Sequence, residues 1–222
     1  MDIASNRAVK LVSIALIATV VLQLIYMAFL GGPQPAEAGA ALTNADVIRY
    51  FDERGAQITS VWAIEAAAFI IIALTAFVAL ARGAAMAAAW CALGLFGVFN
   101  LIQIGIGLAM FEPAARAGGD ESGLFFVFVS GAFFFFYLAK VFLGIAAASF
   151  GLRIAAARSA GLKILGGVTA IAGLAAIGAN FAAMMLGNPV LLLAGATGTA
   201  AALFTAVAAG FALRLSKLRL SR

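Results

Sequence analysis

The stretch Gly123–Gly151, GLFFVFVSGAFFFFYLAKVFLGIAAASFG, decides the fold class of this chain. A helix needs about 20 consecutive apolar residues to cross the hydrocarbon core of a bilayer. This stretch is longer and almost entirely apolar, so it predicts a membrane-spanning helix that tilts or extends past the hydrocarbon. One residue conflicts with that environment, because Lys140 lies near the middle of the stretch.

Lys140 cannot easily reach water from this position. Its Cα lies about 16 Å from the Gly151 end of the helix, at about 1.5 Å per residue, which is more than a lysine side chain can bridge by extending to the interface. A cation at mid-bilayer costs at least about 2.5–3.5 kcal/mol. We therefore expect Lys140 to face the interior of a helix bundle, either as a static hydrogen-bonding group between helices or as the charge that a ligand or a proton meets.

The composition extends this interpretation to the whole chain. The 222 residues are 65% hydrophobic and 10% charged, with a mean hydropathy of +1.14, against about 45–50% apolar and 25% charged in soluble domains. We predict an all-α integral membrane protein that forms one polytopic domain over residues 1–222. Nucleic acid is not an expected partner, because the distribution of the basic residues along the chain accounts for the net charge of +5.

Catalytic and cofactor-binding motifs are missing from the sequence. The chain has one cysteine and no histidine, which excludes an internal disulfide, histidine-ligated haem and the common zinc sites. It also lacks a Walker A loop, a G-x-S-x-G elbow and an H-E-x-x-H motif. We predict no cofactor and no metal, and an enzyme is disfavoured.

Six apolar segments are long enough to span a membrane. Their expected bounds are about 11–30, 60–81, 84–111, 123–151, 162–186 and 190–213. The first segment with Ala36-Glu37-Ala38 resembles a signal peptide, but its apolar run of about 20 residues exceeds the usual 7–15. We expect it to be an uncleaved first helix.

A short amphipathic helix is expected in the first outer loop. Thr43 and Asp46 have the spacing of a capping box, and Gly55 is a plausible C-cap. Apolar residues lie on one side of this segment and charged residues on the other. We predict a separate helix that lies on the bilayer or across the mouth of the bundle.

Charged residues separate by side when six spans are assumed. One side has ten bases and one acid, namely Arg7, Lys10, Arg82, Arg153, Arg158, Lys163, Arg214, Lys217, Arg219, Arg222 and Asp2. The other has three bases and seven acids, namely Arg49, Arg54, Arg116, Glu37, Asp46, Asp52, Glu53, Glu112, Asp120 and Glu121. The positive-inside rule then predicts cytoplasmic N- and C-termini in a bacterial-type inner (plasma) membrane.

Polar side chains within the spans gather in the outer half of the predicted bundle. The candidate ligand-binding residues are Lys140, Tyr137, Asn100, Gln103, Glu65, Asn180 and Gln23. A polar cavity that opens outward and closes near Lys140 would explain this distribution. Glu65 is expected about 10 Å shallower than Lys140, so a direct ion pair, a water bridge and a ligand bridge all remain open.

Two classes of function follow from these residues. The first is a small membrane protein that binds or transports an amphipathic or anionic small molecule in the outward pocket, or a proton-coupled carrier that uses Glu65 and Lys140. The second is a non-catalytic structural or accessory subunit of a larger membrane complex, surrounded like any such protein by membrane lipids. Its partner helix would bind the small-residue face of the sixth span, formed by Gly198, Ala202, Ala206 and Gly210.

Overall fold

The computed structural model describes residues 3–84, 86–117 and 123–220, and the regular structure in these ranges is helical. The elements are α1 (Ile3–Ile25), the π-helical turn η1 (Tyr26–Leu30), α2 (Asn44–Ala81), α3 (Ala87–Ala117), α4 (Gly123–Ala155), α5 (Ala160–Leu186), the 3₁₀ turn η2 (Asn188–Val190) and α6 (Leu191–Leu220). Six of these helices are long and apolar enough to cross a membrane. The expected all-helical chain with six helices long and apolar enough to span a membrane is confirmed.

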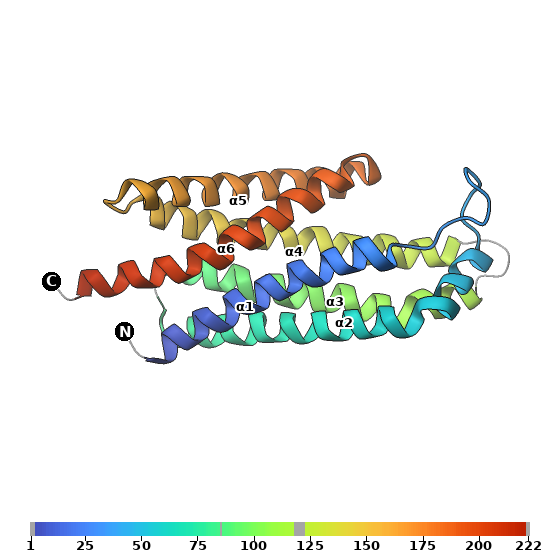
Figure 1. Ribbon diagram of the computed structural model, residues 1–222, viewed down its shortest axis with the longest axis horizontal. Helices are drawn as coiled ribbons and strands as arrows, with labels where there is room; N and C mark the ends of the chain where they lie inside the picture. The colour runs from blue at the N-terminus through green and yellow to red at the C-terminus, as the bar shows by residue number, and fades with distance from the viewer. Residues whose placement is uncertain (1–2, 85, 118–122, 221–222) are drawn as a thin grey trace.

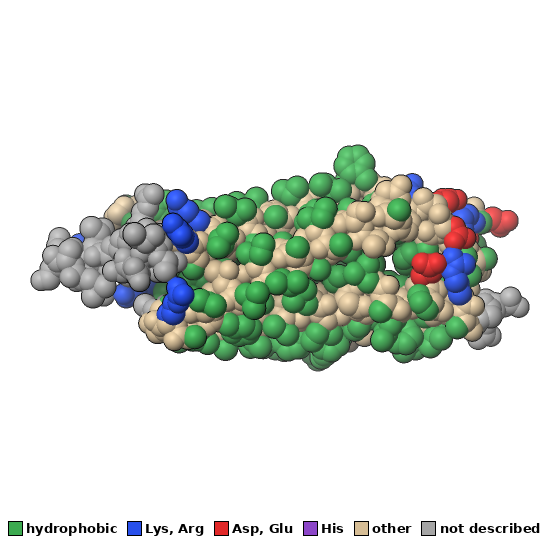
Figure 2. Space-filling view, turned by 90° about the horizontal axis from the view of Figure 1, so that it is seen from below, with side chains coloured by type: hydrophobic (Ala, Val, Ile, Leu, Met, Phe, Trp, Pro, Cys, Tyr) green, Lys and Arg blue, Asp and Glu red, His purple; other side chains and the backbone are tan. Residues whose placement is uncertain are grey.

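The helices form one elongated bundle in which α1 begins and α6 finishes at the same end (Figure 1). On the face seen in Figure 2, Lys and Arg side chains lie at that end, acidic side chains together with further Lys and Arg lie at the opposite end, and an apolar belt separates the two ends. We call these the basic end and the acidic end. Large apolar side chains such as Ile14, Phe29 and Met185 are 65%, 73% and 85% exposed on the outside of the bundle, as expected for a surface that contacts lipid.

The prediction of a separate helix in the first loop is wrong. The segment is helical, and the capping box of Thr43 and Asp46 is present, but the helix continues through Gly55 and into the second span as the 38-residue α2. A Cβ at Gly55 would contact nothing within 4 Å, so this glycine sits in an uninterrupted helix with open space beside it. The amphipathic segment is therefore a continuous extension of α2.

Helix α3 also extends further toward the acidic end of the bundle than the expected boundary at residue 111. The helix continues to Ala117 and includes Pro113. Arg116 near its end binds Glu112 of the same helix at 2.8 Å and Asp52 of α2 at 2.6 Å. These exposed ion pairs join the extension of α2 to α3, while Asp120 and Glu121 lie outside the described residues.

Helix α4 lies at the centre of the packing, with contacts to α3, α5 and α6, and α1 packs between α2 and α6. Two pairs of glycines bring α4 and α5 together. A Cβ on Gly144 would lie 2.6 Å from the Gly173 carbonyl oxygen, and a Cβ on Gly151 would lie 2.7 Å from that of Gly166. Small residues allow such close backbone approach, so these glycines fix the depth and rotation of α4, the helix that carries Lys140.

Candidate functional site

Lys140 is buried near the middle of α4. The residue is 2% exposed, and it is followed one turn later by Gly144, which packs on α5. Gly144 shares the helix face of Lys140, so α5 packs close to the lysine, whose side chain contacts α1, α3 and α6. The expected interior position of Lys140 is observed, and the side chain does not extend to either end of the bundle.

Two aromatic rings and a glycine surround the lysine. Its Nζ lies 5.0 Å from the ring centroid of Phe136 on α4 and 5.6 Å from that of Phe96 on α3, within the range of cation–π attraction. The aliphatic stem crosses Gly198 of α6, where a Cβ would lie 2.9 Å from Lys140 Cδ. Phe96, Phe136 and Gly198 were not among the expected site residues, although Phe136 precedes Lys140 by four positions and so shares its helix face.

Gln23 of α1 supplies the polar contact. Lys140 Nζ donates a long hydrogen bond of 3.4 Å to Gln23 Oε1. An amide can accept on its oxygen while it donates from its nitrogen, and the Gln23 side chain also makes a polar contact with the Glu65 carboxylate of α2. Gln23 therefore connects a buried base and a buried acid that come from different helices.

Glu65 is 7% exposed, one helical turn beyond Trp62 of α2. It attracts Lys140 electrostatically, yet the two are not among the three ion pairs within 4.0 Å that the described residues form. A direct ion pair is thus not observed among the described residues, and Gln23 lies against both side chains. We call Lys140, Gln23 and Glu65 the polar network.

Aromatic residues cover the network toward the acidic end. Tyr26 stacks on Trp62 at 5.8 Å between ring centroids, and Trp62 meets Phe111 of α3 edge-on at 6.0 Å. The Tyr26 and Tyr50 hydroxyls are 3.2 Å apart, and Tyr50 donates to the Gly31 carbonyl at 2.7 Å. Tyr26 begins the π-helical turn η1, an irregularity that occurs frequently at functional sites.

The four other expected site residues lie outside the network. Tyr137 packs with Ala183 and Ala194 between α4, α5 and α6. Gln103 is half-buried on α3 and makes no hydrogen bond with the residues that the structure describes.

The remaining two are the fully buried asparagines. Asn100 donates to the Phe96 carbonyl of its own helix at 2.8 Å, and Asn180 donates to Ala176 at 2.8 Å and to Ala194 of α6 at 3.3 Å. Their side-chain oxygens have no hydrogen-bond partner among the described residues. Asn180 links α5 to α6, and Asn100 stands one turn from the ring that faces Lys140.

A cavity of about 490 Å³ lies at the acidic end, lined by Phe29, Leu30, Glu53, Arg54 and Gln57. Figure 2 shows a hollow at this end with acidic and basic side chains at its border. None of the five lining residues belongs to the polar network. The expected continuous pocket from this end to Lys140 therefore stays a prediction.

The small-residue face of α6 packs inside the chain at three of its four positions. Gly198 contacts Lys140, Ala202 is buried, and Ala206 accepts a hydrogen bond of 2.7 Å from Ser13 of α1 through its carbonyl. The surroundings of Gly210 lie outside the described residues. A partner helix at this face stays a prediction.

No protein-family model, curated protein or solved structure matches this chain.

Proposed function

We propose that this chain is a multi-pass membrane protein that binds or transports an amphipathic or anionic small molecule at the polar network of Lys140, Gln23 and Glu65. Lys140 is the counter-charge for the anionic group, and Gln23 orients it. The acidic end faces outward, and the basic end with both termini lies in the cytoplasm of a bacterial-type inner membrane.

The observation that carries this proposal is that a buried base and a buried acid from different helices meet through the half-buried amide of a third helix. Lys140 and Glu65 are 2% and 7% exposed, and charged groups inside a membrane bundle are costly and typically functional. Gln23 holds the two apart, so the lysine keeps donors that an anion can use. Ligand entry requires the aromatic residues at Tyr26 and Trp62 to move, and η1 is the irregular segment that carries one of them.

The test is ligand-dependent thermal stability of the full chain purified in an uncharged detergent. The probes are linear carboxylates and alkyl phosphates of increasing chain length. A ligand that binds only the folded protein raises its stability in proportion to occupancy, so we expect at least one amphipathic anion to raise the unfolding temperature of the wild type. This increase is lost in Lys140→Met and largely kept in Lys140→Arg.

Thr169→Val is the matched control, because Thr169 is also fully buried but its hydroxyl bonds to Leu165 of its own helix. It is expected to keep the ligand response. An equal response in Lys140→Met and wild type would contradict the proposal, as would the absence of a response to every anion in the series.

The close packing around the lysine favours a second candidate function. Phe96, Phe136 and Gly198 enclose its side chain, as expected of a group that fastens helices in a structural or accessory subunit. Crosslinking in native membranes would then give a specific heteromeric product. Recovery of a stable monomer without a co-purifying polypeptide counts against this second candidate.

A further inference from the structure

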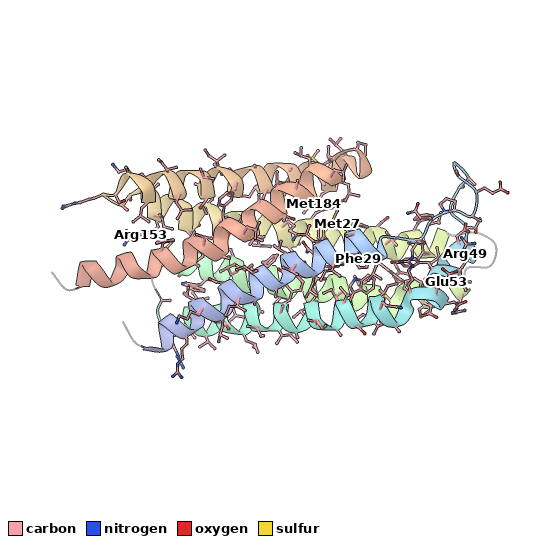
Figure 3. All side chains as sticks on the ribbon, viewed as in Figure 1. Met27, Phe29, Arg49, Glu53, Arg153 and Met184 are labelled. Atoms are coloured by element: carbon pink, nitrogen blue, oxygen red, sulfur yellow. The ribbon has the colours of Figure 1, made fainter. Side chains whose placement is uncertain are left out.

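The cavity at the acidic end combines features that the polar network does not use. Its lining comes from two segments, with Phe29 and Leu30 at the end of η1 and Glu53, Arg54 and Gln57 on the extension of α2. Phe29 is 73% exposed. Figure 3 shows Phe29 and Glu53 toward the acidic end of the bundle. One wall of the cavity is thus apolar and the other is charged.

The cavity stands at the level of a membrane interface. Leu30 ends the apolar segment of α1, and Gly31, Gly32 and Pro33 follow it directly. The polar residues that follow an apolar span of this length lie at the headgroup region. A ligand in this cavity could therefore extend an apolar chain along Phe29 into the bilayer while its polar part stays among the charged residues.

The two charges at the cavity are both available. Arg54 Nη1 donates to the Phe29 carbonyl at 2.5 Å, and a guanidinium has four further N–H donors. Neither Arg54 nor Glu53 takes part in an ion pair within the described ranges 3–84, 86–117 and 123–220. The cavity rim therefore offers a cation and an anion that are not neutralised by each other.

We propose that this cavity binds the headgroup of a zwitterionic phospholipid. Arg54 and Gln57 donate to the phosphate, Glu53 accepts from the ammonium group, and the acyl chains lie along Phe29 and Leu30. The cavity volume of about 490 Å³ falls within the usual range of small-molecule sites. This proposal does not rest on the proposed function, because the two sites share no residue.

The test is native mass spectrometry of the full chain in detergent, titrated with lipids that have identical dioleoyl chains. Phosphatidylethanolamine carries both charges, phosphatidylglycerol carries only the phosphate, and dioleoylglycerol carries neither. We expect phosphatidylethanolamine to bind about tenfold more tightly than phosphatidylglycerol, the factor expected from one charged contact. Dioleoylglycerol is expected to bind most weakly.

Glu53→Gln is the decisive variant, because Glu53 makes no hydrogen bond with another described residue that the fold would lose. It should abolish the preference for phosphatidylethanolamine over phosphatidylglycerol. Arg54→Gln should weaken the binding of both phospholipids, and Arg54→Lys should retain part of it. Glu37→Gln and Arg158→Gln, exposed at other places, are controls expected to leave both affinities unchanged.

Equal affinity of the wild type for phosphatidylethanolamine and phosphatidylglycerol overturns the proposal, as does a preference that survives Glu53→Gln. A further arm uses glycerophosphoethanolamine, which has the same headgroup without acyl chains. If it binds as tightly as the lipid, the occupant is a free zwitterion and the lipid assignment is wrong. Lys140→Met is expected to leave these lipid affinities unchanged, although it removes the response to anions at the polar network. Failure of the lipid proposal can therefore be told apart from failure of the proposed function.

Discussion

Gly144 of α4 and Gly173 of α5 approach so closely that a Cβ on either would lie 2.6 Å or 2.5 Å from the carbonyl oxygen of the other. Seven residues further along each helix, in opposite chain directions, Gly151 and Gly166 repeat the arrangement. Because the obstacle in each case is backbone, a side chain there cannot be accommodated by a change of rotamer. These two pairs hold α4 against α5 beside Lys140, because Gly144 lies one turn from the lysine on the same helix face.

Gly144→Ala should destabilise the protein by about 1–3 kcal/mol, the usual range for inserting a methyl group into a packed interior. The measurement is the free energy of unfolding in a denaturing-detergent titration. Gly178→Ala is the matched control, since a Cβ at Gly178 of α5 would contact nothing within 4 Å. It should be neutral or slightly stabilising because alanine has the higher helix propensity. A Gly144→Ala variant as stable as Gly178→Ala would contradict the packing of α4 on α5.

Thr43→Ala should loosen the extension of α2 without affecting the span. Thr43 Oγ1 accepts from the Asp46 backbone N–H at 3.3 Å, and Asp46 Oδ2 accepts from the Thr43 backbone N–H at 3.1 Å. Loss of such an N-cap costs about 1 kcal/mol. Hydrogen exchange should become faster over 44–54 and stay unchanged over 65–81, while Thr59→Ala, an exposed residue of the same helix, should change neither. Uniform acceleration along α2 would argue against a local role for the cap.

The sequence predicted the fold class because the bilayer imposes a length on each helix. Apolar runs near 20 residues leave little choice of structure, and all six were found. The ends of helices were harder to predict, since polar residues such as those after Glu112 and around Gly55 suit both a loop and a helix in water. A glycine costs a helix only about 1 kcal/mol, so Gly55 alone does not end α2.

The candidate site was predictable only in part. Burial of Lys140 followed from the cost of a charge in hydrocarbon, and Gln23 and Glu65 were expected to line the same outward cavity, with Glu65 about 10 Å shallower than Lys140. Which polar residues meet depends on how each helix is rotated about its own axis, and the almost uniformly apolar α4 carries little information about rotation. Asn180 and Tyr137 therefore turned out to face α6 rather than Lys140.

Lys140 and Glu65 should be energetically coupled although Gln23 separates them. Lys140→Met leaves a buried carboxylate without its base, and Glu65→Gln leaves a buried ammonium without its acid, so each should cost up to about 3–5 kcal/mol. The double variant should cost at least about 1 kcal/mol less than the sum of the two single changes. The free energies of unfolding of all four proteins give the coupling directly.

The control for this cycle pairs Lys140→Met with Thr169→Val. Thr169 of α5 directly precedes Ala170, whose backbone nitrogen faces Gly151 of α4. Gly151 lies about 16 Å along α4 from Lys140, at 1.5 Å per residue. The two changes should be additive to within about 0.5 kcal/mol. Additivity of Lys140→Met with Glu65→Gln as well would mean that Gln23 does not transmit the interaction.

Gly198→Ala tests the contact between α6 and the lysine stem. The added Cβ would lie 2.9 Å from Lys140 Cδ and 3.2 Å from Cγ, so the side chain must shift and its hydrogen bond to Gln23, already 3.4 Å long, should weaken. We expect a loss of about 1 kcal/mol, at the lower limit for overpacking, because a flexible side chain yields more readily than backbone. In a Lys140→Ala background the obstacle is gone, and the same substitution should be neutral or stabilising. An equal cost in both backgrounds, measured by the same unfolding titration, would place the stem of Lys140 away from α6.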